Sequence, residues 1–254
     1  MNRIIRLAVL SLLPGIAASV PAGAQAPEVP APKPAPALPA VEQVLDKYVQ
    51  ALGGKASIEK LTSRVSKGTF EGPGIDGSVE IYAKAPNKTA SMVDVPGFGQ
   101  VRQAFDGSVG WVDNPQAGLR EMSGQELSTT KRGAEFYQVI KLQQLYPKMT
   151  LKGAQKLGTR EAYMIEADPG DGSLRRMYFD TQTGLLVRSE IERDTPQGRA
   201  TFDSELEDYK EVDGVKVPFT LRQSTPTLSF VIKLTEVRHN VPIDGARFAK
   251  PAAQ

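Results

Sequence analysis

The feature that most constrains the fold is an alternation of apolar and polar residues in two neighbouring runs, VKVPFTLR at residues 215–222 and LSFVIKLT at residues 228–235. Side chains on a β-strand point alternately to the two faces of the sheet, so a two-residue period predicts strands with one buried and one wet face. The pair Asp213-Gly214, directly before the first run, is a strong hairpin signal. This part of the sequence therefore predicts antiparallel β structure.

Comparable β-rich runs recur every eight to twelve residues or so along most of the chain, with turn-forming residues between them. The expected strands are 63–71, 77–85, 89–95, 99–106, 108–112, 150–157, 160–167, 174–179, 184–193, 200–210, 215–223 and 227–240. We therefore expect residues 41–251 to form one mainly β domain with helices (α+β), in which a large antiparallel sheet is strongly curved or nearly closed.

Two segments have a helical period instead. Apolar residues at 41, 44, 45, 48, 49 and 52 share one face of a helix that Gly53-Gly54 ends, and Ser57 is expected to cap a short further turn to Leu61. The second segment begins at the capping-box sequence SGQE, residues 123–126, and extends to about Leu145 with an expected break at Gly133. Both segments are expected to lie against the sheet.

Residues 1–24 have the features of a cleaved signal peptide. Arg3 and Arg6 precede the apolar stretch 7–20, and Ala22-Gly23-Ala24 fits the small-residue cleavage rule. An uncleaved anchor is the alternative, but the stretch is shorter than the roughly 20 residues that a membrane span needs. Residues 25–40 contain six prolines and predict an extended Pro/Ala-rich linker. We expect export to the periplasm of a Gram-negative bacterium, without a stable membrane span.

The charge balance argues against a nucleic-acid partner. The whole chain has 31 Lys and Arg against 29 Asp and Glu, and loss of Arg3 and Arg6 with the signal peptide, which has no acidic residue, leaves 29 of each. A neutral chain without a basic patch is poorly suited to bind phosphate backbones. The chain has no cysteine, which excludes disulfides, thiolate chemistry and a lipid-modified N-terminal cysteine. We expect a monomer stabilised by its core.

The sequence offers little for catalysis or metal binding. Its single histidine, His239, ends the last expected strand, and no serine lies in a nucleophile-elbow pattern, so a hydrogen-bonding role is expected. Asp168, Asp171 and Asp180 lie near glycine-rich turns, where Asp side chains commonly stabilise the turn, and their spacing fits no EF-hand. We therefore expect no catalytic residue, no metal and no cofactor.

Two further features leave alternatives open. Glu205 and Glu207 share one face of an expected strand, either as a solvated acidic face, which we favour, or as a carboxylate pair of the kind that glycoside hydrolases use. Trp111, which follows the turn at Asp106-Gly107, serves either as a core anchor or in a ligand site.

The order of several short motifs resembles that of a known superfamily. The motifs are Ala51-Leu52-Gly53-Gly54, Ile58-Glu59-Lys60-Leu61, Gly68, Asp106-Gly107, Gly110-Trp111, Tyr178-Phe179-Asp180, Thr183-Gly184-Leu185-Leu186, Asp208-Tyr209-Lys210, Val212-Asp213-Gly214-Val215, Pro218 and Phe248. Together they resemble the LolA/LolB-like periplasmic lipoprotein carriers, especially the outer-membrane lipoprotein-sorting type. This resemblance implies an unclosed antiparallel β-barrel of about eleven strands wrapped around helices, with an apolar cavity for acyl chains.

Strand parity identifies side chains expected to line such a cavity. Each of the last three expected strands places a pair of large apolar residues on one face, and two residues of the helical insert, one helical turn apart, are expected on the opposite wall. These residues are Phe202, Leu206, Phe219, Leu221, Phe230, Ile232, Phe136 and Ile140.

The expected function is that of a non-catalytic periplasmic carrier or binding protein whose ligand is an acyl chain, a lipid or a lipoprotein. The alternative is a protein-interaction or envelope-stress sensor module on the same fold, with an envelope protein as partner and no lipid transport. An unrecognised hydrolase is a third, less favoured interpretation. A continuous and accessible apolar cavity discriminates between the first two, because a sensor can have a filled interior.

Overall fold

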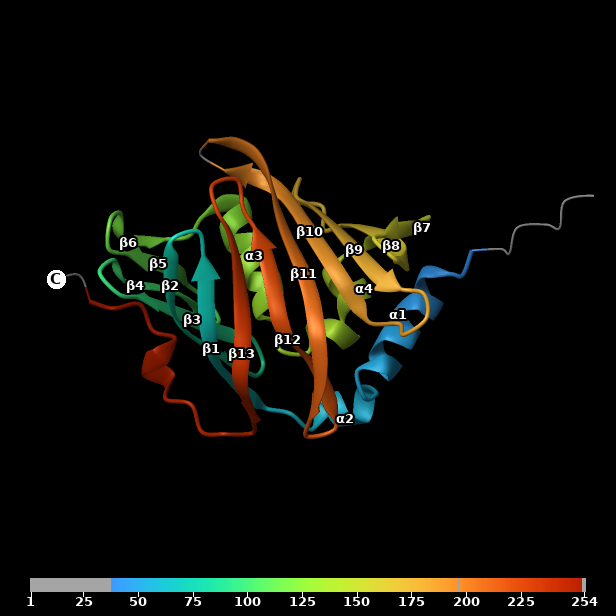
Figure 1. The fold of residues 1–254 in the computed structure, drawn as a ribbon, viewed down its shortest axis with the longest axis horizontal. Coiled ribbons are helices and arrows are strands. Elements are labelled where there is room, and N and C mark those ends of the chain that lie inside the picture. The colour runs from blue at the N-terminus through green and yellow to red at the C-terminus, as the bar shows by residue number, and fades with distance from the viewer. Residues whose placement is uncertain (1–37, 196, 253–254) are drawn as a thin grey trace, which may run out of the picture. The chain divides into compact units, whose positions relative to one another are not determined.

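The strands of the protein form one continuous antiparallel sheet in the computed structural model, which describes residues 38–195 and 197–252 (Figure 1). The expected signal peptide, residues 1–24, lies outside the described residues, as does the expected linker except for its last three residues. Within the described ranges the sheet has 13 strands.

The sheet consists of two meanders in which consecutive strands pair. The first meander contains β1 (Ser63–Gly72), β2 (Ile75–Lys84), β3 (Lys88–Val95), β4 (Gly99–Phe105), β5 (Gly110–Asn114) and β6 (Gly118–Glu121). The second contains β7 (Lys148–Leu157), β8 (Arg160–Asp168), β9 (Leu174–Asp180), β10 (Leu186–Thr195), β11 (Gly198–Val212), β12 (Val215–Ser224) and β13 (Ser229–His239). Pairing of β1 with β13 joins the two meanders, so β6 and β7 lie at the two edges and the sheet is not closed.

Short helices precede, separate and follow the meanders. They are α1 (Val41–Ala51), α2 (Lys55–Glu59), α3 (Gly124–Ala134), the 3-10 helix η1 (Gln138–Ile140), α4 (Leu142–Leu145) and the 3-10 helix η2 (Gly245–Arg247). In Figure 1 the strands of the second meander curve in front of α3, while α1 and α2 lie below β9 and β10.

The expectation of about eleven strands is wrong, because the described sheet has 13. The strand that no sequence pattern indicated is β6, which contains four residues and a single apolar side chain, Leu119. A two-residue period cannot be seen in so short a segment, and β6 is held by its backbone pairing with β5. Each strand expected from the sequence has a counterpart among the other strands.

The helical segments lie where the sequence pattern places them, but their starts and ends differ in detail. Helix α3 continues through Gly133, where a break was expected, and ends at Ala134, and α2 ends at Glu59 and not at Leu61. Helix α2 begins at Lys55, so Ser57 lies within it and does not cap it. Helix α3 does begin after Ser123, but the Ser123 side chain makes no capping hydrogen bond. Glu126 of the expected capping box instead accepts hydrogen bonds from Nη1 and Nη2 of Arg120, at 2.7 and 2.8 Å.

The hairpin between β11 and β12 confirms the prediction from Asp213-Gly214. Both residues have positive φ, 52° and 77°, as a two-residue type I′ turn requires. The end of α1 packs directly on this turn, since a Cβ on Gly53 would lie 2.0 Å from the carbonyl oxygen of Gly214. The amide of Lys216 also donates to the carbonyl of Leu52 at 2.8 Å. Two motifs far apart in the sequence are therefore one structural contact.

Different segments of the chain pack on the two faces of the sheet. The inner face, defined here as the face that packs on α1, α2 and α3, contains the larger apolar clusters. On the outer face of the first meander, the C-terminal segment packs over Trp111 through Phe248. Trp111 is 3% exposed and its indole N–H donates to the carbonyl of Phe248 at 3.0 Å, which makes it a core anchor.

Candidate functional site

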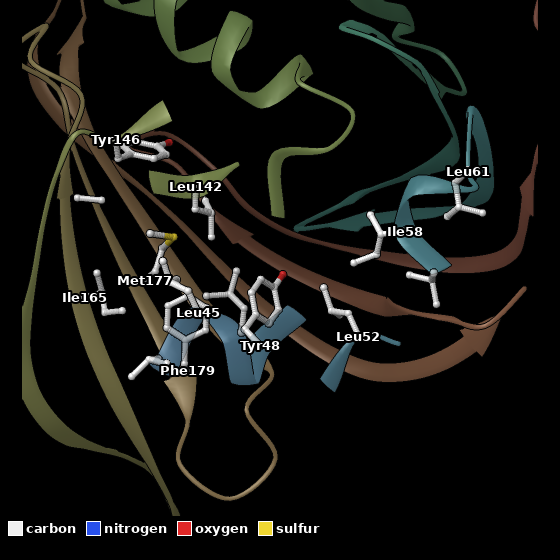
Figure 2. Close-up of a cluster of buried hydrophobic side chains, with 14 residues drawn as sticks. Leu45, Tyr48, Leu52, Ile58, Leu61, Leu142, Tyr146, Ile165, Met177 and Phe179 are labelled. Atoms are coloured by element: carbon white, nitrogen blue, oxygen red, sulfur yellow. The ribbon is translucent and has the colours of Figure 1, made fainter. Parts of the chain in front are cut away.

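One half of the inner face is filled by helices. We call this set the helix-filled cluster, and Figure 2 shows it with α1 lying across the strands of the second meander. The rings of Tyr48 on α1 and Phe179 on β9 lie 5.1 Å apart. Its buried members are Val44, Leu45, Tyr48, Leu52, Ile58, Leu61, Leu142, Tyr146, Ile165, Ala167, Met177, Phe179, Leu186 and Val215.

Two tyrosine hydroxyls, those of Tyr48 and Tyr209, are buried in or against the helix-filled cluster. Burial raises the pKa of the Tyr48 hydroxyl to about 12, although nearby Arg175 and Arg64 oppose the shift. The Tyr209 hydroxyl donates to the carbonyl of Leu186 at 2.7 Å, and burial raises its pKa as well. Such phenols stay protonated at neutral pH, so they do not act as bases.

The other half of the inner face forms a second apolar set, which we call the sheet cluster. Its buried members come from both meanders and are Phe70, Val79, Val95, Val217, Phe219, Ile232, Leu234 and Val237. Phe70 stands opposite Ile232 in the β1–β13 pairing, and Ile232 stands opposite Leu221 in the β12–β13 pairing. Directly opposed residues share a face, so these side chains form one row across the junction of the meanders.

A cavity of about 290 Å³ lies between the sheet cluster and α3. Eight of its thirteen lining residues are apolar. They are Phe70, Val79, Ile81, Val93, Ala104, Met122, Phe230 and Ile232. The polar remainder consists of Thr89, Ser91, Gln103, Thr130 and Gln223. The rings of Phe70 and Phe230 lie 4.8 Å apart on one wall, and Thr130 belongs to α3.

Helix α3 is held over the sheet by hydrogen bonds to the turn between β8 and β9. Arg132 Nη1 and Ser128 Oγ donate to Oδ2 of Asp171 at 2.7 and 2.5 Å. Burial alone would raise the pKa of Asp171, but hydrogen bonds from Ser128, Ser173 and Arg132 outweigh it and hold the pKa well below its usual range. The carboxylate therefore stays ionised and fixes α3 at physiological pH.

Four of the eight side chains predicted to line a cavity lie in or against the sheet cluster. Phe219 and Ile232 are buried members, and Leu221 and Phe230 pack against them. Phe230 and Ile232 also line the cavity itself. This half of the sequence prediction stays a proposal, now attached to a specific cavity.

The other four lie elsewhere on the inner face. Leu206, Phe136 and Ile140 pack against the helix-filled cluster. Phe136 lies in the turn after α3 and Ile140 ends η1, so the two do not share one α-helix as expected. The guanidinium of Arg193 lies 4.4 Å from the ring centre of Phe202.

Sequence reasoning missed the cavity residues that come from the first meander. Val79 and Ile81 lie two residues apart on β2, and Ser91 and Val93 lie two residues apart on β3. The same parity rule would have placed each pair on one face. The signal is weaker there because the inward positions of β3 include polar Thr89 and Ser91, so apolar and polar residues do not alternate regularly.

His239 has the hydrogen-bonding role expected for it. Its side chain is 1% exposed, and Nδ1 lies 3.1 Å from Oδ2 of Asp213 in the β11–β12 turn. Burial lowers its pKa, which the hydrogen bond to Asp213 opposes, so the imidazole is predominantly neutral at neutral pH. Nε2 is buried and has no hydrogen-bond partner among the described residues.

The three aspartates near glycine-rich turns stabilise those turns, as predicted. Asp168, Asp171 and Asp180 each accept a hydrogen bond from the backbone N–H two residues later, at 2.7 to 3.0 Å. In the part of the chain that the structure describes, no group of three or more His, Cys, Asp or Glu is placed to hold a metal ion.

The carboxylate pair on β11 faces away from the cavity. Glu205 is exposed, and Glu207 accepts a hydrogen bond from Nε of Arg222 at 3.2 Å. Both lie on the face opposite to Leu206, as strand alternation requires.

Across residues 38–195 and 197–252, no helix has the length and apolarity needed to span a membrane.

These features define a class: an open antiparallel β half-barrel whose inner face packs on short helices and retains a partly apolar cavity. The particular fold is LolA-like. Neither a protein-family model nor a curated protein matches the sequence, so the likeness is one of structure.

Three solved structures carry this comparison. A DUF1329 family protein from Desulfovibrio piger is 15% identical with a TM-score of 0.56, and covers 84% of this chain and 99% of its own. A domain assigned to an outer membrane lipoprotein-sorting protein from Vibrio parahaemolyticus is 13% identical, with a TM-score of 0.55 and coverages of 82% and 97%. A LolA superfamily protein from Nitrosomonas europaea is 12% identical, with a TM-score of 0.52 and the same coverages. At such identities the likeness concerns the fold alone.

Proposed function

We propose that this protein is a non-catalytic periplasmic carrier or binding protein that holds an acyl chain, as part of a lipid or a lipid-anchored protein, in the cavity beneath α3. The observation that carries the proposal is the cavity of about 290 Å³ with a mainly apolar lining on the inner face. The LolA-like fold supports it, because a solved lipoprotein-sorting domain has the same architecture.

The size and chemistry of the cavity fit part of an acyl chain. Its volume is near the lower end of the roughly 300–1,000 Å³ typical of small-molecule sites, so it suits a segment of chain and not a whole lipid. Each methylene removed from water contributes about 0.8 kcal/mol. A segment of about five methylenes would then gain roughly 4 kcal/mol before the cost of ordering it.

A fluorescent acyl chain tests the proposal. The polyene cis-parinaric acid and its glycerol monoester become fluorescent in apolar surroundings, and the wild-type protein is expected to take up at least one of them. Phe230→Gln should weaken uptake about tenfold or more, because it places an amide in the apolar wall. Val231→Gln, on the opposite face of the same strand, is the matched control and should leave uptake unchanged.

Failure of the wild-type protein to take up either probe would overturn the carrier proposal. The protein-interaction alternative would then be the better account of the fold. The proposal also places the mature protein in the periplasm with Gln25 as its first residue, which N-terminal sequencing of periplasmic material checks.

A further inference from the structure

The lining of the cavity beneath α3 has no charged residue among the described residues that form it. Three further cavities on the described part of the chain each include at least three charged side chains, such as Arg188, Glu205 and Arg102. In a chain with 24% charged residues, the exclusion of charge from this one site is a specific feature of its chemistry.

The cavity is not uniformly apolar, however. Thr89 and Ser91 lie two residues apart on β3, and Ser91 stands directly opposite Gln103 of β4. Such opposed side chains have Cβ atoms about 4.5–5.5 Å apart, so the three groups form one polar corner. Thr130 of α3 and Gln223 of β12 add neutral polar groups to other parts of the lining.

The polar corner has unused hydrogen-bonding capacity. Within the described ranges, the Gln103 side chain makes no hydrogen bond with another residue, although its amide offers two donors and an acceptor. Gln103 is exposed although strand register turns it to the inner face, so the cavity opens to solvent beside it. A ligand entering there meets the Gln103 amide and the hydroxyls of Ser91 and Thr89 first, and the wall with Phe230 and Ile232 lies farther along the sheet.

From this arrangement we infer that the preferred ligand is an acyl chain attached to an uncharged ester or amide head, with the head hydrogen-bonded at the polar corner of Thr89, Ser91 and Gln103. The inference rests on the proposed function and adds the chemical class of the ligand. A carboxylate or ammonium head would lose hydration at the mouth of the cavity without gaining an opposite charge, whereas an ester or amide finds donors and acceptors there.

A free fatty acid and a glycerol ester with the same chain test whether the site prefers an uncharged head to a charged one. At pH 8, where the acid is ionised, the monoparinaroyl glycerol ester should bind about tenfold more tightly than cis-parinaric acid. Gln103→Leu should reduce this preference to about twofold or less. Gln100→Leu, on the same strand but facing the outer side, should preserve it.

A gain-of-function variant provides an independent check. Gln103→Lys places a cation at the polar corner and should reverse the preference, so that the acid binds more tightly than the ester. Equal binding of acid and ester by the wild-type protein would overturn the inference and leave the carrier proposal intact. Uptake of neither probe would overturn the carrier proposal itself.

The same head chemistry occurs in free glycerides and in the diacylglyceryl group of a lipid-anchored protein. Displacement of the bound ester probe by dioleoylglycerol, but not by a synthetic peptide that begins with diacylglyceryl-cysteine, identifies the free lipid as the source. The reverse result identifies the lipid-anchored protein. Unlabelled monooleoylglycerol is the positive control for displacement. If it displaces the probe at concentrations at which neither diacyl competitor does, ligands with two acyl chains are excluded. The inferred ligand is then an ester or amide with a single acyl chain.

Discussion

The two halves of the inner face are built on the same sheet but are covered differently. In the helix-filled cluster, α1, α2 and α4 place side chains such as Leu45 and Leu142 directly against the strands. In the sheet cluster, side chains of neighbouring paired strands form one row across the junction of the two meanders, and α3 lies over them with a cavity of about 290 Å³ between. The difference shows how one curved sheet can have a stabilising half and a half with room for a ligand.

The position of α3 accounts for this division of roles. Its polar contacts include those of Arg132 and Ser128 with Asp171 at the turn between β8 and β9, and that of Glu126 with Arg120 on β6. A helix held by hydrogen bonds at its rim does not need a large apolar face beneath it. The only residue of α3 itself that is buried is Ala134, at its end, whereas α1 buries Val44, Leu45 and Tyr48.

The largest expected effect is the loss of a large side chain from the helix-filled cluster. Phe179→Ala should lower the free energy of unfolding by about 3–5 kcal/mol, because Phe179 is 1% exposed and packs on Tyr48. Phe230→Ala should cost no more than about 2 kcal/mol, because its ring already borders a cavity. Urea denaturation of both variants checks the comparison, and equal costs would contradict it.

Enlarging a side chain tests the same contrast in the opposite direction. Ala167→Phe, at a position with 0% exposure in the helix-filled cluster, should cost about 1–3 kcal/mol through overpacking. Val93→Phe projects into the cavity and should cost less than about 1 kcal/mol while reducing acyl-probe uptake. Thermal denaturation and probe titration measure the two effects, and a strongly destabilised Val93→Phe would show that the cavity has no spare room.

Neutralising the carboxylate that fixes α3 should have an intermediate effect. Asp171→Asn should lower the free energy of unfolding by about 1–2 kcal/mol at pH 7. The pKa of Asp171 is lowered in the folded protein, so its stabilisation is fully present above the ordinary pKa of 3.8 and is lost as pH falls below that value toward the folded pKa. The difference between wild type and variant in urea denaturation should therefore shrink below pH 3.8, and a constant difference would refute the assignment.

The smallest expected effect is on the outer face, which serves as a reference for both halves. Glu207→Gln removes the exposed pair with Arg222 and should change the free energy of unfolding by no more than about 0.5 kcal/mol. Acyl-probe uptake should be unchanged, because the pair faces away from the cavity. A marked loss of uptake with normal folding would give the carboxylates of β11 a functional role.

The sequence predicted the strands well where side-chain period and turn chemistry agree. The Asp213-Gly214 turn defines β11 and β12, because a two-residue loop fixes the register of its strands. The alternation after the turn defines β12 and β13. The pattern failed at β6, because a strand of four residues with one apolar side chain shows no two-residue period.

The cavity was harder to predict than the strands that line it. Parity correctly assigned Phe230 and Ile232 to the inner face, but it cannot show which stretch of that face a helix will fill. That depends on where α1 and α3 dock, and their docking uses contacts such as Gly53 on Gly214 and Arg132 on Asp171. Such contacts join residues far apart in the chain, and no local period encodes them.

Because β1 pairs with β13, the sheet cannot be completed before the last strand of the chain is available. The hydroxyl of Thr235 donates to the carbonyl of Lys67, a contact between residues 168 positions apart in the sequence. Until β13 pairs with β1, the first meander has an unpaired edge at β1, and the wall of the cavity that contains Phe230 is missing. Contacts of such separation form slowly because a long loop must close first. The cavity proposed to hold the ligand can therefore form only once the last strand is available to pair with the first.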